Sequence, residues 1–322
     1  MGWLIQAAGL MMRCDISSTA MKTFKNIIVG IDFTPSCRNA LREAARRASL
    51  DHATVTALHV MDEFLVHELK KALSQDEAAI RADWETRLKT FVEESDVGGA
   101  HIATEVRIGS AFAELVEACH AHAADLLIMG AKGSHGGTNR IGIIAARCVR
   151  KAPIDVLIVR EDAQGPFKHV VACVDFSENS AKAVQYALHL AAQDKADVDC
   201  LFVYQSAMAM SVDYGGYAPP IPIGPDDEAL KSWQRDLESF VSQLTRSSPD
   251  IKVRTLVKER LNIRETILDH VTESKADLVV LGTRGKSGLR ELLIGTTAEK
   301  IIQHAHCSIL AVKPDPFDSS SK

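Results

Sequence analysis

The chain carries one sequence pattern twice, and this internal repeat restricts its possible folds more than any other feature. The stretch NIIVGIDFTPSCRNAL (26–41) matches HVVACVDFSENSAKAV (169–184) at an offset of 143 residues. Farther on, ADLLIMGAKGSHGG (124–137) matches ADLVVLGTRGKSGL (276–289) at an offset of 152 residues. The second copy therefore has nine extra residues between these segments, and we place them in the Gly- and Pro-rich stretch 205–225.

The repeat also predicts the domain organisation. A chain of 322 residues suits two domains of about 150 residues each. The segment EDAQGPF (161–167) contains charge, Gly and Pro, as expected of a boundary. We therefore expect a dispensable leader over 1–21, one domain over 22–161, a second over 168–314 and a tail over 315–322.

Each copy predicts five parallel strands that alternate with helices. Short apolar runs without polar alternation are typical of strands covered on both faces. These runs lie at 26–31, 54–60, 102–107, 125–129 and 155–160, and at 169–174, 198–203, 251–257, 277–281 and 308–312. Helical stretches lie between them at 36–49, 75–94, 111–122, 178–193, 226–245, 263–273 and 296–305. This alternation predicts two tandem doubly wound, Rossmann-like α/β domains.

Composition argues against several classes of partner. A net charge of −5 and a pI near 6.2 give no electrostatic basis for nucleic-acid binding. No apolar run reaches the roughly 18 residues that a membrane-spanning helix needs, so we expect no membrane insertion. The seven cysteines are scattered and form no CxxC pair, which favours a reducing, cytoplasmic location over a disulfide framework or a zinc site.

The first twenty residues match no part of the repeat. An apolar stretch (3–12) lacks the preceding Lys or Arg of a secretory signal, and Met21 opens MKTFKNIIVGID like a natural start. A chain starting at Met21 is expected to fold with an unchanged melting temperature. A short docked segment and a targeting segment remain as alternatives.

The most specific functional pattern is the turn GTRGKSGLRELLIGTT (282–297), between a buried strand and a helix. Glycines let backbone N–H groups approach an anion closely, and the helix start at Gly295 adds N–H donors and a positive dipole end. Thr296 can add a hydroxyl hydrogen bond, while Arg284 and Lys286 raise the local potential. Ligands of open α/β sheets bind at this end of the strands, so we predict a phosphate site here.

Plainer interpretations remain for these residues. A Gly-rich turn can be only a tight connection, and Asp32 and Asp175, which follow the first strand of each copy, can cap the next helix. The paired histidines in HAH (120–122) and QHAH (303–306) are two residues apart and do not share a helix face. We therefore predict no metal site, and no catalytic residue.

The spacing G-x2-G-x9-G-[ST] after a strand, with Asp at the end of the first strand, resembles the nucleotide-binding pattern of the universal stress protein family. The resemblance extends over both copies. It implies that Asp175 and Val203 hold the adenosine end of ATP, which binds with or without Mg2+. The implied phosphate-binding residues are Gly282, Arg284, Gly285, Gly295, Thr296 and Thr297.

The same resemblance implies an arrangement of strands and domains. The family has the sheet order 3-2-1-4-5 and dimerises through the last strand. In a tandem chain, the last strands 155–160 and 308–313 would then pair with each other within one molecule. A further homodimer stays open.

The first copy departs from this pattern. It has eight residues instead of nine between Gly133 and Gly142, and Ile143 stands where the second copy has Thr296. The residues that remain for a weaker site are Asp32, Val60, Gly130, Gly133 and Gly142. We therefore expect one tight nucleotide site per chain, in the second domain.

Three functions are compatible with these patterns. The first is an ATP-binding regulatory protein of the stress response without fast catalysis. The second is an enzyme that slowly cleaves ATP or transfers adenylate, although the chain lacks the GxxxxGK[ST] motif and an acidic cluster for metal-assisted phosphoryl transfer. The third is a partner-binding scaffold that has lost its nucleotide.

Overall fold

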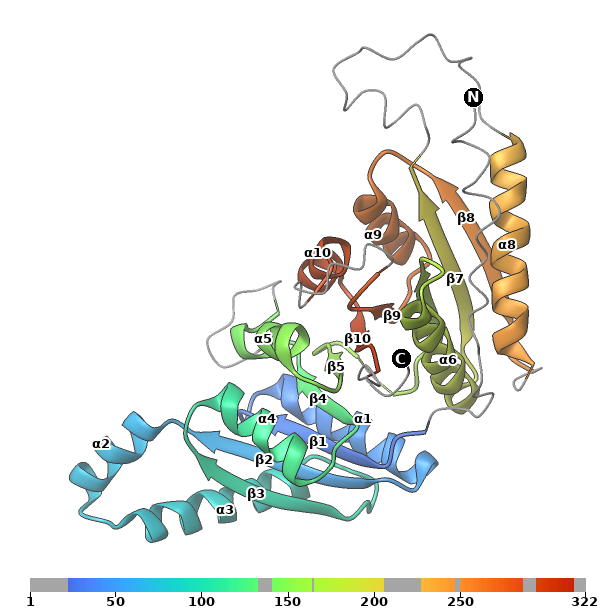
Figure 1. Cartoon of the computed structure of the whole chain (residues 1–322). Helices are drawn as coiled ribbons and strands as arrows, with labels where there is room; N and C mark the ends of the chain where they lie inside the picture. Colours follow the sequence, from blue (N-terminus) through green and yellow to red (C-terminus); the bar gives the residue numbers. More distant parts are fainter. Residues whose placement is uncertain are drawn as a thin grey trace, which may run out of the picture.

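The structure, a computed structural model, describes residues 23–132, 141–163, 165–205, 227–246, 250–285 and 294–315. The leader expected over 1–21, nearly all of the stretch 205–225 and most of the tail 315–322 lie outside these residues. Two α/β halves meet along a shared sheet (Figure 1).

The first half alternates strands and helices as expected. Its elements are β1 (Asn26–Ile31), α1 (Pro35–Asp51), β2 (Thr54–Met61), α2 (Glu63–Leu73), α3 (Glu77–Glu93), β3 (Ile102–Ile108), α4 (Ala111–Ala121), β4 (Leu126–Gly130), α5 (Ile143–Lys151) and β5 (Asp155–Val159). The expected helices did not include α2, of which only Val66 is buried.

The second half repeats the pattern. Its elements are β6 (His169–Val174), α6 (Glu178–Asp194), β7 (Asp197–Tyr204), α8 (Asp227–Thr245), β8 (Val253–Glu259), α9 (Ile263–Glu273), β9 (Leu278–Gly282), α10 (Thr296–His304) and β10 (Ser308–Val312). The observed bounds differ from the expected ones by two residues at most, as at β8.

All ten strands form one sheet, in the order β3-β2-β1-β4-β5-β10-β9-β6-β7-β8. Each half therefore has the predicted order 3-2-1-4-5, with parallel neighbours. The two five-stranded halves are joined because β5 and β10 pair antiparallel. Leu157 faces Leu310 at the centre of this pairing, and neither strand is left as an open apolar edge. The expected pairing of the last strands is confirmed.

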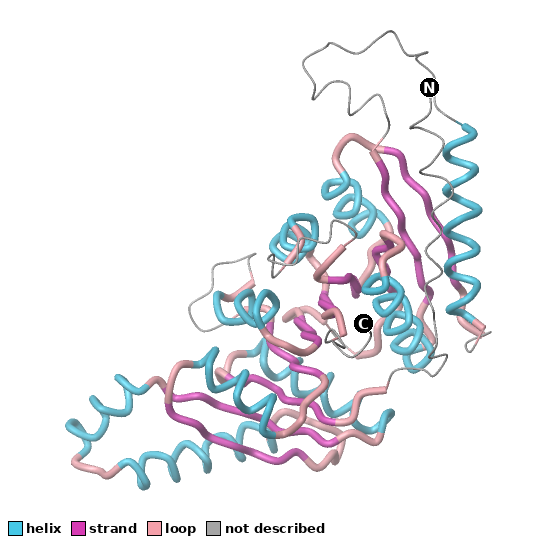
Figure 2. The backbone as a smooth tube through the Cα atoms, viewed as in Figure 1, coloured by secondary structure: helices cyan, strands magenta, loops and turns pink. Residues whose placement is uncertain are grey.

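Helices cover both faces of the sheet (Figure 2). The buried side chains of α1, α3, α6 and α8 form one apolar cluster, and those of α4, α5, α9 and α10 form the other. Side chains of a strand point alternately into the two, as Ile27 and Ile28 do. No helix in the described residues has both the length and the apolarity needed to cross a membrane.

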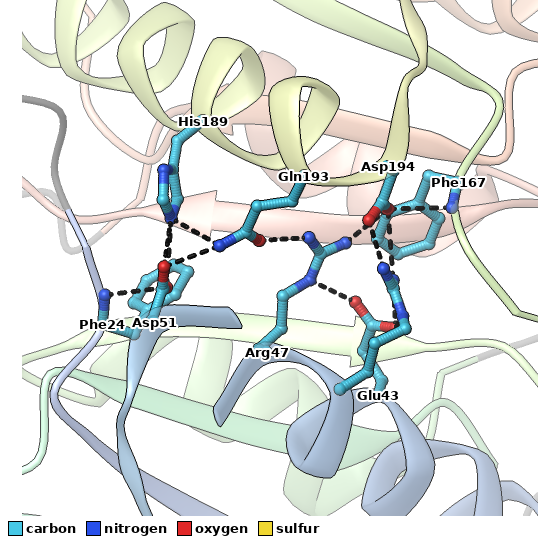
Figure 3. Close-up of polar contacts among 9 residues, drawn as sticks. Phe24, Glu43, Arg47, Asp51, Phe167, His189, Gln193 and Asp194 are labelled. Atoms are coloured by element: carbon cyan, nitrogen blue, oxygen red, sulfur yellow. Dashed lines mark hydrogen bonds and ion pairs between the residues drawn. The ribbon is translucent and has the colours of Figure 1, made fainter. Parts of the chain in front are cut away.

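A buried polar network forms a second contact between the halves, where α1 lies against α6 (Figure 3). Arg47 is fully buried, and its guanidinium donates to Glu43 (Nε–Oε1 2.7 Å), Gln193 (Nη1–Oε1 2.5 Å) and Asp194 (Nη2–Oδ2 2.6 Å). Arg46 also donates to Asp194. A charge-bearing network thus replaces apolar packing along this helix pair.

The network follows the repeat. Asp51 and Asp194 end the equivalent helices α1 and α6, and each accepts a backbone N–H from its own half, that of Phe24 (3.1 Å) or Phe167 (2.9 Å). Asp51 also contacts His189 Nε2 of the other half at 2.9 Å, as Asp194 contacts Arg46. The two halves therefore pack about a pseudo-twofold axis.

A second buried polar cluster lies at the amino-terminal edge of the sheet in the second half. Asp199 on β7 is fully buried and accepts from Arg254 Nε (2.6 Å), His169 Nε2 (2.9 Å) and His270 Nε2 (3.0 Å). Although burial alone would raise the pKa of Asp199, hydrogen bonds from His270, Arg254 and His169 hold it well below its usual range.

This lowered pKa predicts a loss of stability in acid. A depressed carboxyl pKa contributes stability that is present above about pH 4 and is lost as the pH falls toward the folded-state pKa. As the pH falls from about 4 to about 2, wild type should therefore lose unfolding free energy through a carboxyl titration that Asp199→Asn lacks. Urea titrations across this range test it. Asp197→Asn, which changes an exposed ion pair on the same strand, should behave like wild type.

Candidate functional site

The turn after β6 holds Asp175, the first predicted site residue. The N–H and hydroxyl of Ser177 donate to Asp175 Oδ1 at 3.0 and 2.5 Å. Ser177 itself is the N-cap of α6, since its Oγ accepts the Ser180 N–H at 3.1 Å. The interpretation of Asp175 as the helix cap is therefore wrong. Ser177 caps the helix and also holds the Asp175 carboxylate at the end of β6.

Phe176, next to Asp175, has a left-handed backbone (φ 61°), which is strained for a bulky residue. Its ring packs against Phe202 and Phe240, with centroids 4.8 and 5.5 Å away. Phe33 in the first half has the same conformation (φ 62°). Because aromatic packing fixes this conformation in both halves, the adjacent aspartates are placed rigidly.

A Cβ on either of the first two glycines of the predicted loop would meet a neighbouring side chain. A Cβ on Gly282 would lie 2.8 Å from Asn179 Nδ2, and one on Gly285 would lie 2.5 Å from Asp175 Oδ2. Asn179 Nδ2 donates to the Arg284 carbonyl at 3.2 Å and so holds the loop. The predicted residues Asp175, Gly282 and Gly285 therefore come together, and Asn179 is a supporting residue that the sequence did not indicate.

The third glycine has a different environment. Gly295 is the N-cap of α10, with φ −70°, and no side chain of the described residues caps this helix. A Cβ on Gly295 would meet only the Thr283 carbonyl, at 3.7 Å, among the described residues. The Gly295 N–H donates to the same carbonyl at 2.8 Å, which fixes the helix start beside the loop.

Thr296 and Thr297 are the first two residues of α10, the first exposed and the second half-buried. The first N–H groups of any α-helix have no intrahelical acceptor. In α6 and α9, Ser177 and Asn262 accept such N–H groups, but α10 has glycine at this position. The N–H groups at the start of α10 are therefore suited to bind an external anion.

Two further predicted residues lie at the edges of this site. Val203 is buried in β7, within the apolar cluster that includes Ile294 and Ala298 from the start of α10. Arg284 is exposed on the loop. Lys286 lies outside the described residues.

The first half keeps the same framework. Asp32 accepts from Thr34 Oγ1 (2.6 Å) and Cys37 Sγ (2.9 Å). Burial, together with Asp32, raises the pKa of the Cys37 thiol to about 12, so this cysteine is unreactive at neutral pH. A Cβ on Gly130 would lie 2.7 Å from Ser36 Oγ, which matches Gly282 against Asn179. Val60 is half-buried in β2.

The helix start of the first half differs in chemistry. Gly142 is the N-cap of α5, and Ile143 is its first residue, with 83% of its side chain exposed. The structure thus places an apolar chain where the second half presents the Thr296 hydroxyl. Gly133 lies outside the described residues.

The loop cation also differs between the halves. Lys132, the counterpart of Arg284, forms an ion pair with Glu161 at 2.9 Å. At the position of Glu161 the second half has Pro314, which carries no carboxylate. The first half therefore neutralises its own loop cation, a difference that the repeat contains but the motif spacing did not indicate.

Sequence comparison gives the same picture for both halves. The model of the universal stress protein family matches residues 23–160 and 166–313. A universal stress protein of Methanocaldococcus jannaschii is 30% identical over 147 residues, which is 46% of this chain and 82% of that protein. One of Mycolicibacterium smegmatis is 26% identical over 300 residues, which is 89% of this chain and 97% of that protein.

Structure comparison supports the same fold. A universal stress protein from Archaeoglobus fulgidus superposes with a TM-score of 0.59 at 14% identity, over 89% of this chain and 98% of that one. A protein of unknown function from Pseudomonas aeruginosa PAO1 gives a TM-score of 0.59 at 18% identity, over 92% and 95%. At these identities the likeness establishes the fold of the chain.

Proposed function

The chain belongs to the universal stress protein family, and on this basis we propose that its second half binds ATP in a regulatory role in the stress response, without fast catalysis. The observation that carries the proposal is the convergence of two features. Asp175 lies against Gly285 of the phosphate loop, and the start of α10, whose N-cap is a glycine, lies beside the same loop through the hydrogen bond from Gly295 to Thr283.

Gly295 supports this assignment because no close contact among the described residues requires a glycine here. Its φ of −70° suits any residue, and there is room for a Cβ. A phosphate drawn onto the N–H groups of α10 would need the space that a Cβ at this position fills. At Gly282 and Gly285, in contrast, a Cβ would come within 3 Å of Asn179 or Asp175.

The charges fit a polyphosphate. The exposed Arg284 has no counterpart of the Glu161 carboxylate that neutralises Lys132 in the first half. The α10 dipole adds positive potential, and the Thr296 hydroxyl adds a donor. In this proposal Asp175 and Val203 hold the adenosine end, Mg2+ where present arrives with the phosphates, and the protein acts in the cytoplasm.

Two alternatives make different predictions. A slow ATP-cleaving or adenylate-transferring enzyme would convert the nucleotide that it binds, whereas a partner-binding scaffold would bind none. The neutralised loop cation and Ile143 favour the scaffold role for the first half. Equilibrium dialysis with ATP, followed by an assay of the same mixture for ADP and AMP, separates the three. Bound, intact ATP supports the proposal, and no binding overturns it.

Replacing Gly295 with Ala should separate binding from folding. Glycine is better than alanine at an N-cap, while Gly→Ala reduces the entropy of the unfolded chain, so the stability should change by no more than about 1 kcal/mol. ATP affinity should fall by about tenfold, the loss of one hydrogen bond to a charged group. Calorimetric titration and urea unfolding measure the two effects.

Gly285→Ala gives the contrasting case. Its Cβ would lie 2.5 Å from Asp175 Oδ2, so this variant should lose stability as well as affinity. An unchanged affinity in Gly295→Ala would contradict the role given to the start of α10.

A further inference from the structure

The residues directly after the two joining strands are both basic and both buried. Arg160 follows β5 and Lys313 follows β10, with 7% and 6% of their surfaces exposed. Because β5 and β10 pair antiparallel, each side chain is delivered into the opposite half of the molecule. Burying a cation is costly unless it finds strong acceptors.

Arg160 finds its acceptors at the end of α10. Its Nε donates to the Cys307 carbonyl at 3.2 Å, and its Nη2 donates to the carbonyl of Ala305, the C-cap residue of α10. Its backbone N–H also donates to Ser308 Oγ at 3.2 Å. The last carbonyls of a helix lack intrahelical partners and carry its negative dipole end, so a guanidinium there holds the helix end in place.

The other end of the same helix is the start at Gly295 and Thr296. With nine residues, α10 is about 13 Å long and has little freedom to bend. We propose that Arg160 is a positioning residue, by which the first half holds α10 and thereby sets the nucleotide affinity of the second half. This inference rests on the function proposed for the start of α10.

Loss of the Arg160 guanidinium is expected to make α10 more mobile and so to weaken nucleotide binding. Without the guanidinium, the carbonyls of Ala305 and Cys307 would be buried without their donor, and the short helix would move more freely against β10. A nucleotide would then have to order the helix start as it binds, which lowers affinity. By linkage, a bound nucleotide should in turn strengthen the contact between the halves.

The repeat supplies a matched control. Lys313 Nζ donates to the carbonyl of Val149 in the last turn of α5, and the Lys313 backbone N–H donates to Asp155 Oδ1 at 2.6 Å. Lys313 therefore makes the same kind of contact across the same interface, but it holds the helix that begins at Ile143. Loss of this contact should loosen α5 directly and affect α10 only through the contact between the two helices, where Arg150 lies 3.7 Å from Glu299.

The test compares Arg160→Met, Arg160→Lys and Lys313→Met in the full chain. In calorimetric titrations with ATP, Arg160→Met should bind about three- to tenfold more weakly than wild type. Lys313→Met should lose less affinity than Arg160→Met, because Lys313 holds α5 and reaches α10 only through that helix. Arg160→Lys, which keeps the charge, should recover part of the loss. Hydrogen exchange without nucleotide should be faster in α10 for Arg160→Met and in α5 for Lys313→Met.

The outcomes separate this inference from the proposed function. If wild type binds ATP while Arg160→Met binds equally well, or if both Met variants weaken binding equally, the inference is overturned and the function stands. If wild type binds no ATP, the proposed function fails. Exchange then decides whether Arg160 positions α10, and unchanged exchange in Arg160→Met overturns that role too.

Discussion

Replacing Thr296 with Ile should remove most ATP binding by the whole protein. The substitution takes away a hydroxyl donor from the first residue of α10 and puts a branched apolar chain in its place. A hydrogen bond to a charged group contributes roughly 1.5–3 kcal/mol, which corresponds to about a 10- to 150-fold loss of affinity. The variant should still fold, because Ile143 occupies the equivalent position of α5 and lies in solvent. Calorimetric titration with ATP measures the effect.

The reverse change in the first half is the control. Ile143→Thr alone should restore little, because the loop remains one residue short and Lys132 remains paired with Glu161. Titration of the wild-type chain should accordingly give a stoichiometry near one. Two equivalent sites, or binding that survives Thr296→Ile unchanged, would contradict the asymmetry between the halves.

The fold of each half was predictable because the apolar runs and the internal repeat can both be read directly from the sequence. Fully buried strands such as β4 and β9 read as unbroken apolar runs, and the repeat shows that one half must fold like the other. The continuous sheet came from no such pattern. The pairing of β5 with β10 followed only from family resemblance, since an apolar last strand does not reveal what covers it.

The candidate site was predictable where glycine spacing marks a backbone conformation, and less so where side chains meet. Asn179 reads as an ordinary residue in the first turn of a helix, yet it holds the loop through the Arg284 carbonyl. The pairing of Lys132 with Glu161 joins residues 29 positions apart whose proximity depends on the sheet order. Such contacts are consequences of the fold and have no local signature.

The network between α1 and α6 was missed for a related reason. Glu43, Arg46 and Arg47 form a charged run that is usual on a solvent-exposed helix face. Only the pseudo-twofold packing of the halves buries this run against Gln193 and Asp194. These charged residues are therefore buried only when the two halves associate, and this association cannot be read from one copy of the repeat alone.

Replacing Asp194 with Ala should produce the largest loss of stability of the changes considered. Asp194 accepts from Arg46, from Arg47 and from the Phe167 N–H, and the Arg47 side chain is fully buried. Removing the carboxylate leaves the buried Arg47 and its neighbour Arg46 to share the single carboxylate of Glu43, and breaking a buried ion pair typically costs about 3–5 kcal/mol. Urea unfolding should show this loss, and scattering should show whether the halves stay associated.

The pseudo-twofold axis provides the comparison that assigns this loss to charge. Asp51 occupies the equivalent position and accepts the equivalent backbone N–H, but it faces His189 and Gln193, neither of which carries a permanent charge. Asp51→Ala should therefore cost less than Asp194→Ala. Arg38→Ala changes a half-buried residue of α1 that pairs with Glu94 of α3 and lies over the Phe91 ring. It should cost less than Asp194→Ala, because its partner carboxylate is exposed. Equal losses for Asp51→Ala and Asp194→Ala would show that the backbone hydrogen bonds, and not the buried Arg47, account for the stability of this contact.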